Sequence, residues 1–168
     1  MNNTLSTEQL KELFEIQVAF DERIPTLNLT DSKIAYTVEF FEWFNTLETF
    51  KNWKKQPGKP LDVQLDELAD MLAFGLSIAH QSNLNLTDLE PSLPNIESVN
   101  DYQSSYTMYG FMADVVSAGI DEENAVLLPL NIAYNLYTVD QLINAYKKKM
   151  ERNHARQDGT ADTDKGYT

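Results

Sequence analysis

Residues 61–80 read LDVQLDELADMLAFGLSIAH, and their leucines recur at the spacing that places side chains on one face of a helix. Apolar residues keep the same helical spacing through the rest of the chain. Gly and Pro number only six each, and no alternating run of Val, Ile and Thr indicates a strand. The sequence therefore predicts an all-α fold.

Caps and helix breakers divide the chain into about six predicted helices, and its 168 residues suit one domain. The expected helices are a first from Thr7 that ends before Pro25, a second from Asp31 or Ser32 to about Thr49, a third from Leu61 to about His80, a fourth from Tyr102 to Ala118, a fifth after Asp121 and a sixth after the Thr138 cap. We expect one domain over 1–157, with a variable region of loops and helix at 82–120, of which 82–100 is a loop or short-turn region. The small polar residues 158–168 predict a flexible tail.

Charge is distributed unevenly along the chain. Lys and Arg total 13 against 26 Asp and Glu, which gives a formal net charge of -13. No Lys or Arg lies between Pro60 and Tyr146. Because binding to a nucleic-acid polymer or an anionic membrane requires a broad basic face, this balance argues against both classes of partner.

Cysteine is absent, which excludes thiolate nucleophiles and Cys-ligated zinc and suits a reducing compartment. The first residues lack the basic and apolar regions of a secretory leader, and no segment approaches the roughly 20 apolar residues that span a bilayer. We therefore expect a cytoplasmic protein.

Two short acidic motifs are the most informative feature of the sequence. EFFE at 39–42 supplies Glu39 and Glu42, and ELAD at 67–70 supplies Glu67 and Asp70. Each pair shares one helix face, and a short connection between the two helices would bring all four carboxylates together. Such a set of oxygen ligands suits Mg²⁺ or Mn²⁺, and two ions about 3.5–4 Å apart can clamp a phosphate chain. A single acidic pair is more often a solvated surface, but two pairs on adjacent helices favour a metal site that acts on a diphosphate linkage.

Two basic clusters could hold the rest of a nucleotide. The first combines cations with a flat aromatic ring, in Lys51, Trp53 and Lys54. The second shares one face of the last predicted helix, in Lys149, Asn153 and Arg156. The alternative for the second cluster is a basic helix end that complements the helix dipole.

Two further residues could contact a nucleoside. Gln17 lies on the apolar stripe of the first predicted helix, and a buried amide there could pair with the edge of a pyrimidine. Phe74 follows Asp70 by one turn, where it could pack on a sugar and exclude a 2′-hydroxyl. The alternatives are a glutamine satisfied within the core and an ordinary core phenylalanine.

These motifs together resemble a known family. The two acidic pairs are similar to the signature of the all-α nucleoside triphosphate pyrophosphohydrolases, the superfamily that includes the MazG proteins. The specific resemblance is to the dimeric dUTPases of phages and Gram-positive bacteria. It is carried by FEIQVAFDERI at 14–24, EFFEWFN at 39–45, FKNWKK at 50–55, LDELADMLAF at 65–74 and AYKKKMERNHARQ at 145–157.

The resemblance implies a MazG-like helical bundle with the active site in a four-helix core, completed across a homodimer. It implies that Glu39, Glu42, Glu67 and Asp70 bind Mg²⁺ and that Glu39 orients or deprotonates the attacking water. Gln17 and Trp53 would hold uracil, Lys54 or its close competitor Lys51 would contact a phosphate, and Lys149, Asn153 and Arg156 would grip phosphates. The expected reaction converts dUTP, and also dUDP, to dUMP in the cytoplasm of a bacterial host cell. The sequence leaves open whether water attacks the α or β phosphorus, and the resemblance favours β.

The chain departs from the family pattern in two places. Residues 82–120 match no family segment, and the resemblance suggests this variable region as a surface that binds a repressor protein of a mobile genetic element. The family's Gly-Tyr pair occurs only as Gly166-Tyr167, after an acidic insertion. Two alternatives stay open: a MazG-like pyrophosphohydrolase of another nucleotide, and a helical regulator that binds a repressor and keeps the acids as a relic.

Overall fold

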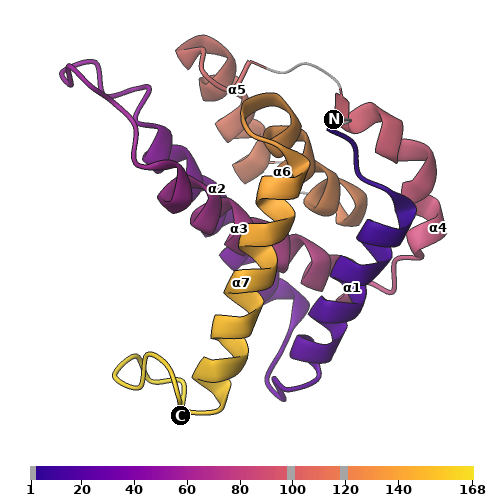
Figure 1. Cartoon of the computed structure of the whole chain (residues 1–168). Coiled ribbons are helices and arrows are strands. Elements are labelled where there is room, and N and C mark those ends of the chain that lie inside the picture. Colours follow the sequence, from indigo (N-terminus) through magenta and orange to yellow (C-terminus); the bar gives the residue numbers. More distant parts are fainter. Residues whose placement is uncertain (1–2, 98–100, 118–120) are drawn as a thin grey trace.

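The computed structural model describes residues 3–97, 101–117 and 121–168 (Figure 1). This part of the chain contains α-helices, one 3-10 helix and no β-strand, which confirms the all-α prediction. The elements are α1 (Thr7–Asp21), α2 (Leu29–Leu47), α3 (Leu61–Gln81), α4 (Leu86–Leu89), η1 (Glu90–Glu97), α5 (Ser105–Ser117), α6 (Glu122–Leu136) and α7 (Val139–Gln157). The short elements α4 and η1 occupy the predicted loop or short-turn region. The predicted end of the fourth helix, Ala118, lies outside the described residues.

Side-chain caps decide where several helices begin. At the start of α1, the Gln9 backbone N–H donates to Ser6 Oγ at 3.1 Å, and the Ser6 N–H donates to Gln9 Oε1 at 2.9 Å. Helix α2 begins before its predicted start because Asn28 Oδ1 accepts a hydrogen bond from the Asp31 N–H at 2.9 Å. Asn28, which precedes the predicted start, is therefore the cap of this helix.

Helix α3 is the central element of the bundle. It packs against α2, α6, α7 and α1 (Figure 1). The side chains of Leu68, Leu72 and Leu76 are fully buried, as their helical spacing predicts. Leu61, at the start of the same stripe, is 48% exposed and lies outside the core. The apolar face of α3 therefore fixes the helix among its neighbours, and its acids lie on another face.

A glycine lets α3 and α6 approach closely. A Cβ atom added at Gly75 would lie 2.1 Å from the backbone oxygen of Ala125 and 2.9 Å from the carbonyl carbon. No side chain fits at that distance, so only glycine permits this packing. The contact fixes α3 against α6 on the side of α3 that also faces Tyr36.

Aromatic contacts join the variable region to α2. Phe111 on α5 packs edge-on against Phe40, with ring centroids 5.5 Å apart, and Tyr102 packs against Trp43 at 6.1 Å. The indole N–H of Trp43 donates to the Tyr137 hydroxyl at 3.2 Å. Within the described ranges, no helix is both long enough and apolar enough to cross a bilayer.

Candidate active site

Helices α2 and α3 run antiparallel, which is the arrangement that the two acidic motifs require. At one end the Lys59 N–H donates to the Thr46 carbonyl at 2.8 Å, and at the other end Gly75 faces Tyr36. Residues that rise in number along α2 therefore meet residues that fall in number along α3. The motif at 39–42 faces the motif at 67–70.

Three of the four predicted acids meet in one cluster. Carboxylate oxygens of Glu39, Glu67 and Asp70, which we call the carboxylate cluster, all lie within 4.8 Å of one another. Glu42 is not among these three, but its charge acts on both Glu39 and Glu67. Glu39 Oε2 is buried and has no hydrogen-bond partner within the described part of the chain. A buried carboxylate oxygen without a partner is costly, so this atom is suited to a cation.

The acids destabilise one another's ionised forms. Burial, followed by the charges of Asp70, Glu42 and Glu67, raises the pKa of Glu39 to about 8. Burial and the charge of Asp70 also raise the pKa of Glu67. Burial raises the pKa of Asp70. Mutual repulsion on this scale is what a divalent cation relieves, so the cluster could bind a metal.

Lys149 on α7 reaches the edge of the carboxylate cluster. Its Nζ donates to Asp70 Oδ2 and to Asp66 Oδ2, both at 2.6 Å, and its side chain is only 5% exposed. Burial alone would lower the pKa of Lys149, but the charge of Asp70 and the hydrogen bonds to both aspartates raise it. An ammonium therefore neutralises one member of the cluster.

A cavity of about 420 Å³ opens beside the carboxylate cluster, and we call it the site cavity. This volume is within the range of pockets that hold small ligands, about 300–1,000 Å³. Acidic groups line one part of its wall, through Glu39 and Asp70, and a cation lines another, through Arg156. An acidic metal-type cluster and a guanidinium that face one ligand-sized cavity suit a polyanion with its metal.

A comparison with known protein families identifies the family of this chain. A family model described as dUTPase matches residues 9–160. The chain belongs to this dUTPase family. The match confirms the family that the sequence motifs indicated, with its all-α fold, and the enzyme class, a dUTP diphosphatase. No curated protein matches the chain.

In this dUTPase, Gln17 lies at the wall of the site cavity and belongs to a polar network. Its Nε2 donates to Asp21 Oδ1 at 2.8 Å, and its Oε1 accepts from the Tyr146 hydroxyl at 3.0 Å. Asp21 Oδ2 also accepts from Ser77 Oγ at 2.8 Å and lies 3.2 Å from His80 Nδ1. The network fixes the orientation of the Gln17 amide at the cavity wall.

Phe74, Asn153 and Arg156 also lie at the wall of the site cavity. Arg156 Nη1 donates to Asn153 Oδ1 at 2.8 Å, so these two α7 residues form one polar unit. Their spacing on one helix face therefore brings together groups that can donate hydrogen bonds to a phosphate.

The first basic cluster lies elsewhere. Trp53 is 72% exposed, on the loop that projects from the end of α2 (Figure 1), and it is not among the residues that line the site cavity. Lys54 and Lys51 instead bind Glu48, at 2.7 and 3.1 Å. The hydrogen bonds from Lys54 and Lys51 hold the pKa of Glu48 at about 2. Within one chain, the structure does not bring these three residues to the carboxylate cluster.

Sequence reasoning missed several residues of the site. Asp21 had a signal, because it follows Gln17 by one helical turn on the same stripe. Asp66 had a weaker one, because it precedes Glu67 in an acidic segment. Asp162, which binds Arg156, had none, because that contact depends on how the tail folds back. Tyr167 lines the site cavity, and its position in a Gly-Tyr pair was its only signal.

Proposed function

We propose that this dUTPase is a Mg²⁺-dependent pyrophosphatase that hydrolyses dUTP, and also dUDP, to dUMP. The observation that carries the proposal is the unpaired Glu39 Oε2, set among acids at a cavity that Arg156 also lines. A ligand that complements both the acids and the guanidinium carries negative charge and binds together with a divalent cation. A nucleoside polyphosphate bound to Mg²⁺ has that chemistry.

In this proposal Glu39, Glu42, Glu67 and Asp70 hold the metal. Hard carboxylate oxygens favour Mg²⁺, and Mn²⁺ is the expected substitute. When bound, such ions neutralise phosphate oxygens and acidify water. Glu39 orients the attacking water and takes its proton, because its carboxylate lies at the cavity wall and a carboxylate is a group that can serve as a general base.

The remaining cavity residues hold the nucleotide. Arg156 and Asn153 donate hydrogen bonds to phosphate oxygens, and Lys149 adds a third donor from the edge of the cluster. Gln17 presents its fixed amide to the uracil edge, and Phe74 packs on the deoxyribose. Binding and orientation by these groups supply the part of catalysis that does not depend on the metal.

We infer that Trp53, Lys51 and Lys54 act on the site cavity of a second copy of the chain in a homodimer. An apolar groove of about 500 Å³ supports this, because Phe50 lines it together with Phe41, Met108, Tyr109 and Met112. Phe50 also lies in the loop that carries Trp53. A second copy seated in the groove would therefore meet that loop.

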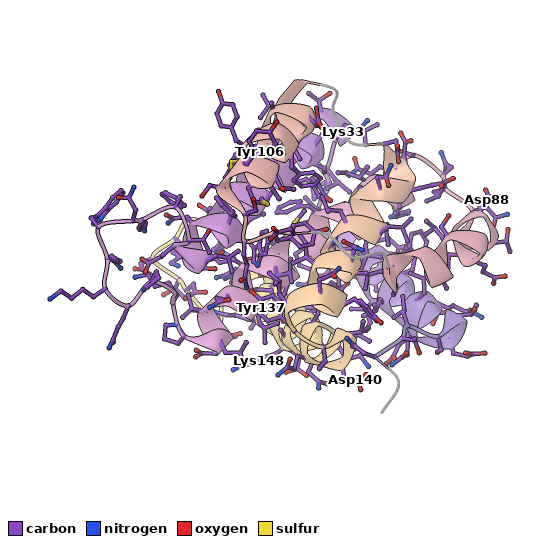
Figure 2. The ribbon with its side chains drawn as sticks, turned by 90° about the horizontal axis from the view of Figure 1, so that it is seen from above. Lys33, Asp88, Tyr106, Tyr137, Asp140 and Lys148 are labelled. Atoms are coloured by element: carbon purple, nitrogen blue, oxygen red, sulfur yellow. The ribbon has the colours of Figure 1, made fainter. Side chains whose placement is uncertain are left out.

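The faces of α2 and α5 near this groove are strongly apolar. Tyr109 is 81% exposed, and Tyr106, which points away from α5 in Figure 2, is 92% exposed. On α2, Val38 and Ile34 are 48% and 59% exposed. Such a concentration of exposed apolar side chains favours association with another protein surface.

A nucleotide panel tests the proposed function. The full chain is incubated with each dNTP, each NTP and dUDP in Mg²⁺, and released phosphate and pyrophosphate are measured. Turnover confined to dUTP and dUDP, and abolished by a chelator, supports the proposal. Preference for another base would instead indicate a MazG-like pyrophosphohydrolase of that nucleotide. No turnover with any nucleotide would favour the remaining alternative, a helical regulator that binds a repressor. The region 82–120 would then be the first surface to examine.

A further inference from the structure

The acidic C-terminal segment 158–168 folds back on α7 through specific contacts (Figure 1). The backbone N–H groups of Thr160 and Ala161 donate to the Ala155 carbonyl at 2.9 and 3.2 Å. Asp158 accepts from Arg23 Nη2 at 2.6 Å, which ties the start of the segment to the end of α1. The flexibility that the sequence predicts for this tail stays a prediction, but its contacts give it a defined position.

Asp162 is the centre of these contacts. Its carboxylate accepts from Arg152 Nε at 2.9 Å, from Arg152 Nη2 at 2.8 Å and from Arg156 Nε at 2.6 Å. The side chain is 14% exposed. The hydrogen bonds from both arginines hold the pKa of Asp162 well below its usual range. Its backbone has φ of 47°, a left-handed conformation that is unusual outside glycine and that stable contacts must maintain.

Arg156 connects Asp162 to the site cavity. Its Nε is held by Asp162 and its Nη1 by Asn153 at 2.8 Å, so two neighbours fix the plane of the guanidinium. A guanidinium carries five N–H donors, and these two bonds use two of them. Arg156 lines the site cavity, whereas Asp162 is not among its lining residues. Asp162 therefore holds the guanidinium from outside the cavity and does not occupy the place of a ligand.

The same residue begins the turn that leads to Tyr167. The Lys165 N–H donates to the Asp162 carbonyl at 3.0 Å, and Gly166 follows with φ of 77°. The Tyr167 ring then lies against Arg156, whose Cζ is 5.1 Å from the ring centroid, and Tyr167 lines the site cavity. Asp162 therefore helps to fix the positions of both Arg156 and Tyr167 at the cavity.

We propose that Asp162 is a positioning residue that fixes Arg156 and the C-terminal segment so that both can hold the phosphates of the nucleotide. The inference rests on the proposed function of Arg156 as a phosphate contact. Free Arg has many rotamers, and fixing it in advance lowers the entropy lost when it binds a phosphate. The acidic insertion between Gln157 and Gly166 then serves the active site of this chain.

Two measurements on the full chain test this role, with Asp162→Asn, Asp162→Glu and the control Asp164→Asn, whose carboxylate is exposed in the same segment. The first is steady-state hydrolysis of dUTP in Mg²⁺. We expect Asp162→Asn to raise KM about tenfold and to change kcat less than about threefold, because a charge-assisted bond that orients the binding group is weakened. Asp162→Glu, which keeps the carboxylate, should return KM to within about threefold of the wild type. Asp164→Asn should change neither constant.

The second measurement is hydrogen exchange of the backbone amides of 158–168 without nucleotide. Exchange should be faster in Asp162→Asn than in the wild type and unchanged in Asp164→Asn. Equal exchange, an unchanged KM or a lowered KM in Asp162→Asn would overturn the proposal, since a lowered KM means that Asp162 competes with the phosphate. Loss of helical circular dichroism would also overturn it, because Asp162 would then support the whole fold. A wild type that hydrolyses no dUTP refutes the proposed function, while exchange still tests whether Asp162 holds the segment.

Discussion

Lys149 Nζ and Asp70 Oδ2 lie 2.6 Å apart, at the edge of a carboxylate cluster that could bind a metal ion. The lysine is almost fully buried, whereas its second partner, Asp66, is 53% exposed. In the proposed function, Asp66 therefore keeps the ammonium at the rim when Asp70 binds the metal. In the proposed function, Lys149 both neutralises the cluster and donates to a phosphate beside it.

Replacing Lys149 by Gln should separate these two effects. Without the ammonium, we expect Mg²⁺ to bind at least about threefold more tightly in the absence of nucleotide, because a nearby positive charge is removed. The KM for dUTP should nevertheless rise about tenfold, because a charged phosphate donor is lost. Calorimetric titration with Mg²⁺ and steady-state kinetics measure the two effects. Lys148→Gln, at the exposed neighbouring lysine, is the control, and weaker Mg²⁺ binding in Lys149→Gln would contradict this account.

Glu39→Gln tests the acid that is proposed to orient the attacking water. It should keep the helical fold and lower kcat for dUTP by at least about a hundredfold, the scale expected for loss of an acid–base group. The amide is close in size to the carboxylate and removes one of the repelling charges, so we expect no loss of thermal stability without metal. Circular dichroism and pyrophosphate release check the two parts. Near-normal turnover would remove Glu39 from the assigned role.

The raised pKa of Glu39 predicts how the stability of the metal-free protein depends on pH. The carboxyl group ionises near 4.5 in the unfolded chain and near 8 in the folded chain. Between these values the folded state binds more protons, so the free energy of unfolding falls as pH rises. We expect the thermal midpoint in a chelator to be lower at pH 8 than at pH 5. Glu39→Gln should reduce that difference, and an unchanged difference would show that another group causes it.

The carboxylate cluster was predictable from the sequence, and the reason is local geometry. Carboxylates three residues apart share a helix face wherever the helix lies, and a connection over 48–60 returns α3 alongside α2. The cluster of Glu39, Glu67 and Asp70 follows from those two facts. The common helix face of Asn153 and Arg156 was predictable for the same reason, because it depends only on the register of α7.

The remaining features depend on tertiary contacts that helical periodicity does not encode. The buried Glu48 forms ion pairs with Lys51 and Lys54, and no pattern in FKNWKK predicts these ion pairs. The helix boundary at Asn28 depends on which of several polar residues supplies the cap. The contact of Asp162 with Arg152 and Arg156 closes a turn in a segment that is small and polar, a composition typical of free tails.

Gly75→Ala tests the close packing of α3 on α6. Since the new Cβ would meet the Ala125 backbone oxygen at 2.1 Å, the helices must separate, which should cost at least about 3 kcal/mol. For a chain of this size the thermal midpoint should fall by about 6–12 °C. Gly110→Ala on α5 is a matched control, since a Cβ there meets nothing within 4 Å. It should leave the midpoint unchanged or raise it slightly, because alanine favours a helix. Equal midpoints for the two variants would contradict the packing argument.

A charge placed in the apolar groove should prevent the proposed homodimer. Tyr109→Lys introduces a cation among Phe41, Met108 and Met112, which a second copy would have to bury. Light scattering should give the mass of a dimer for the wild type and of a monomer for this variant. Thr87→Lys adds the same charge on α4, away from the groove, and should remain dimeric. A monomeric wild type would refute the homodimer directly.

Mixed dimers of Trp53→Ala and Glu39→Gln should recover the activity that each variant lacks alone. If Trp53 acts on the cavity of the other chain, the Glu39 of one subunit meets the Trp53 of its partner in one of the two sites. Random assortment makes about half of the dimers mixed, so about a quarter of all sites should be intact. The measurement is dUTP hydrolysis at limiting substrate after the two variants are unfolded and refolded together. Refolding each variant alone is the control. Activity equal to the mean of the two separate variants would place Trp53 on the cavity of its own chain or on none, because then no mixed site is complete.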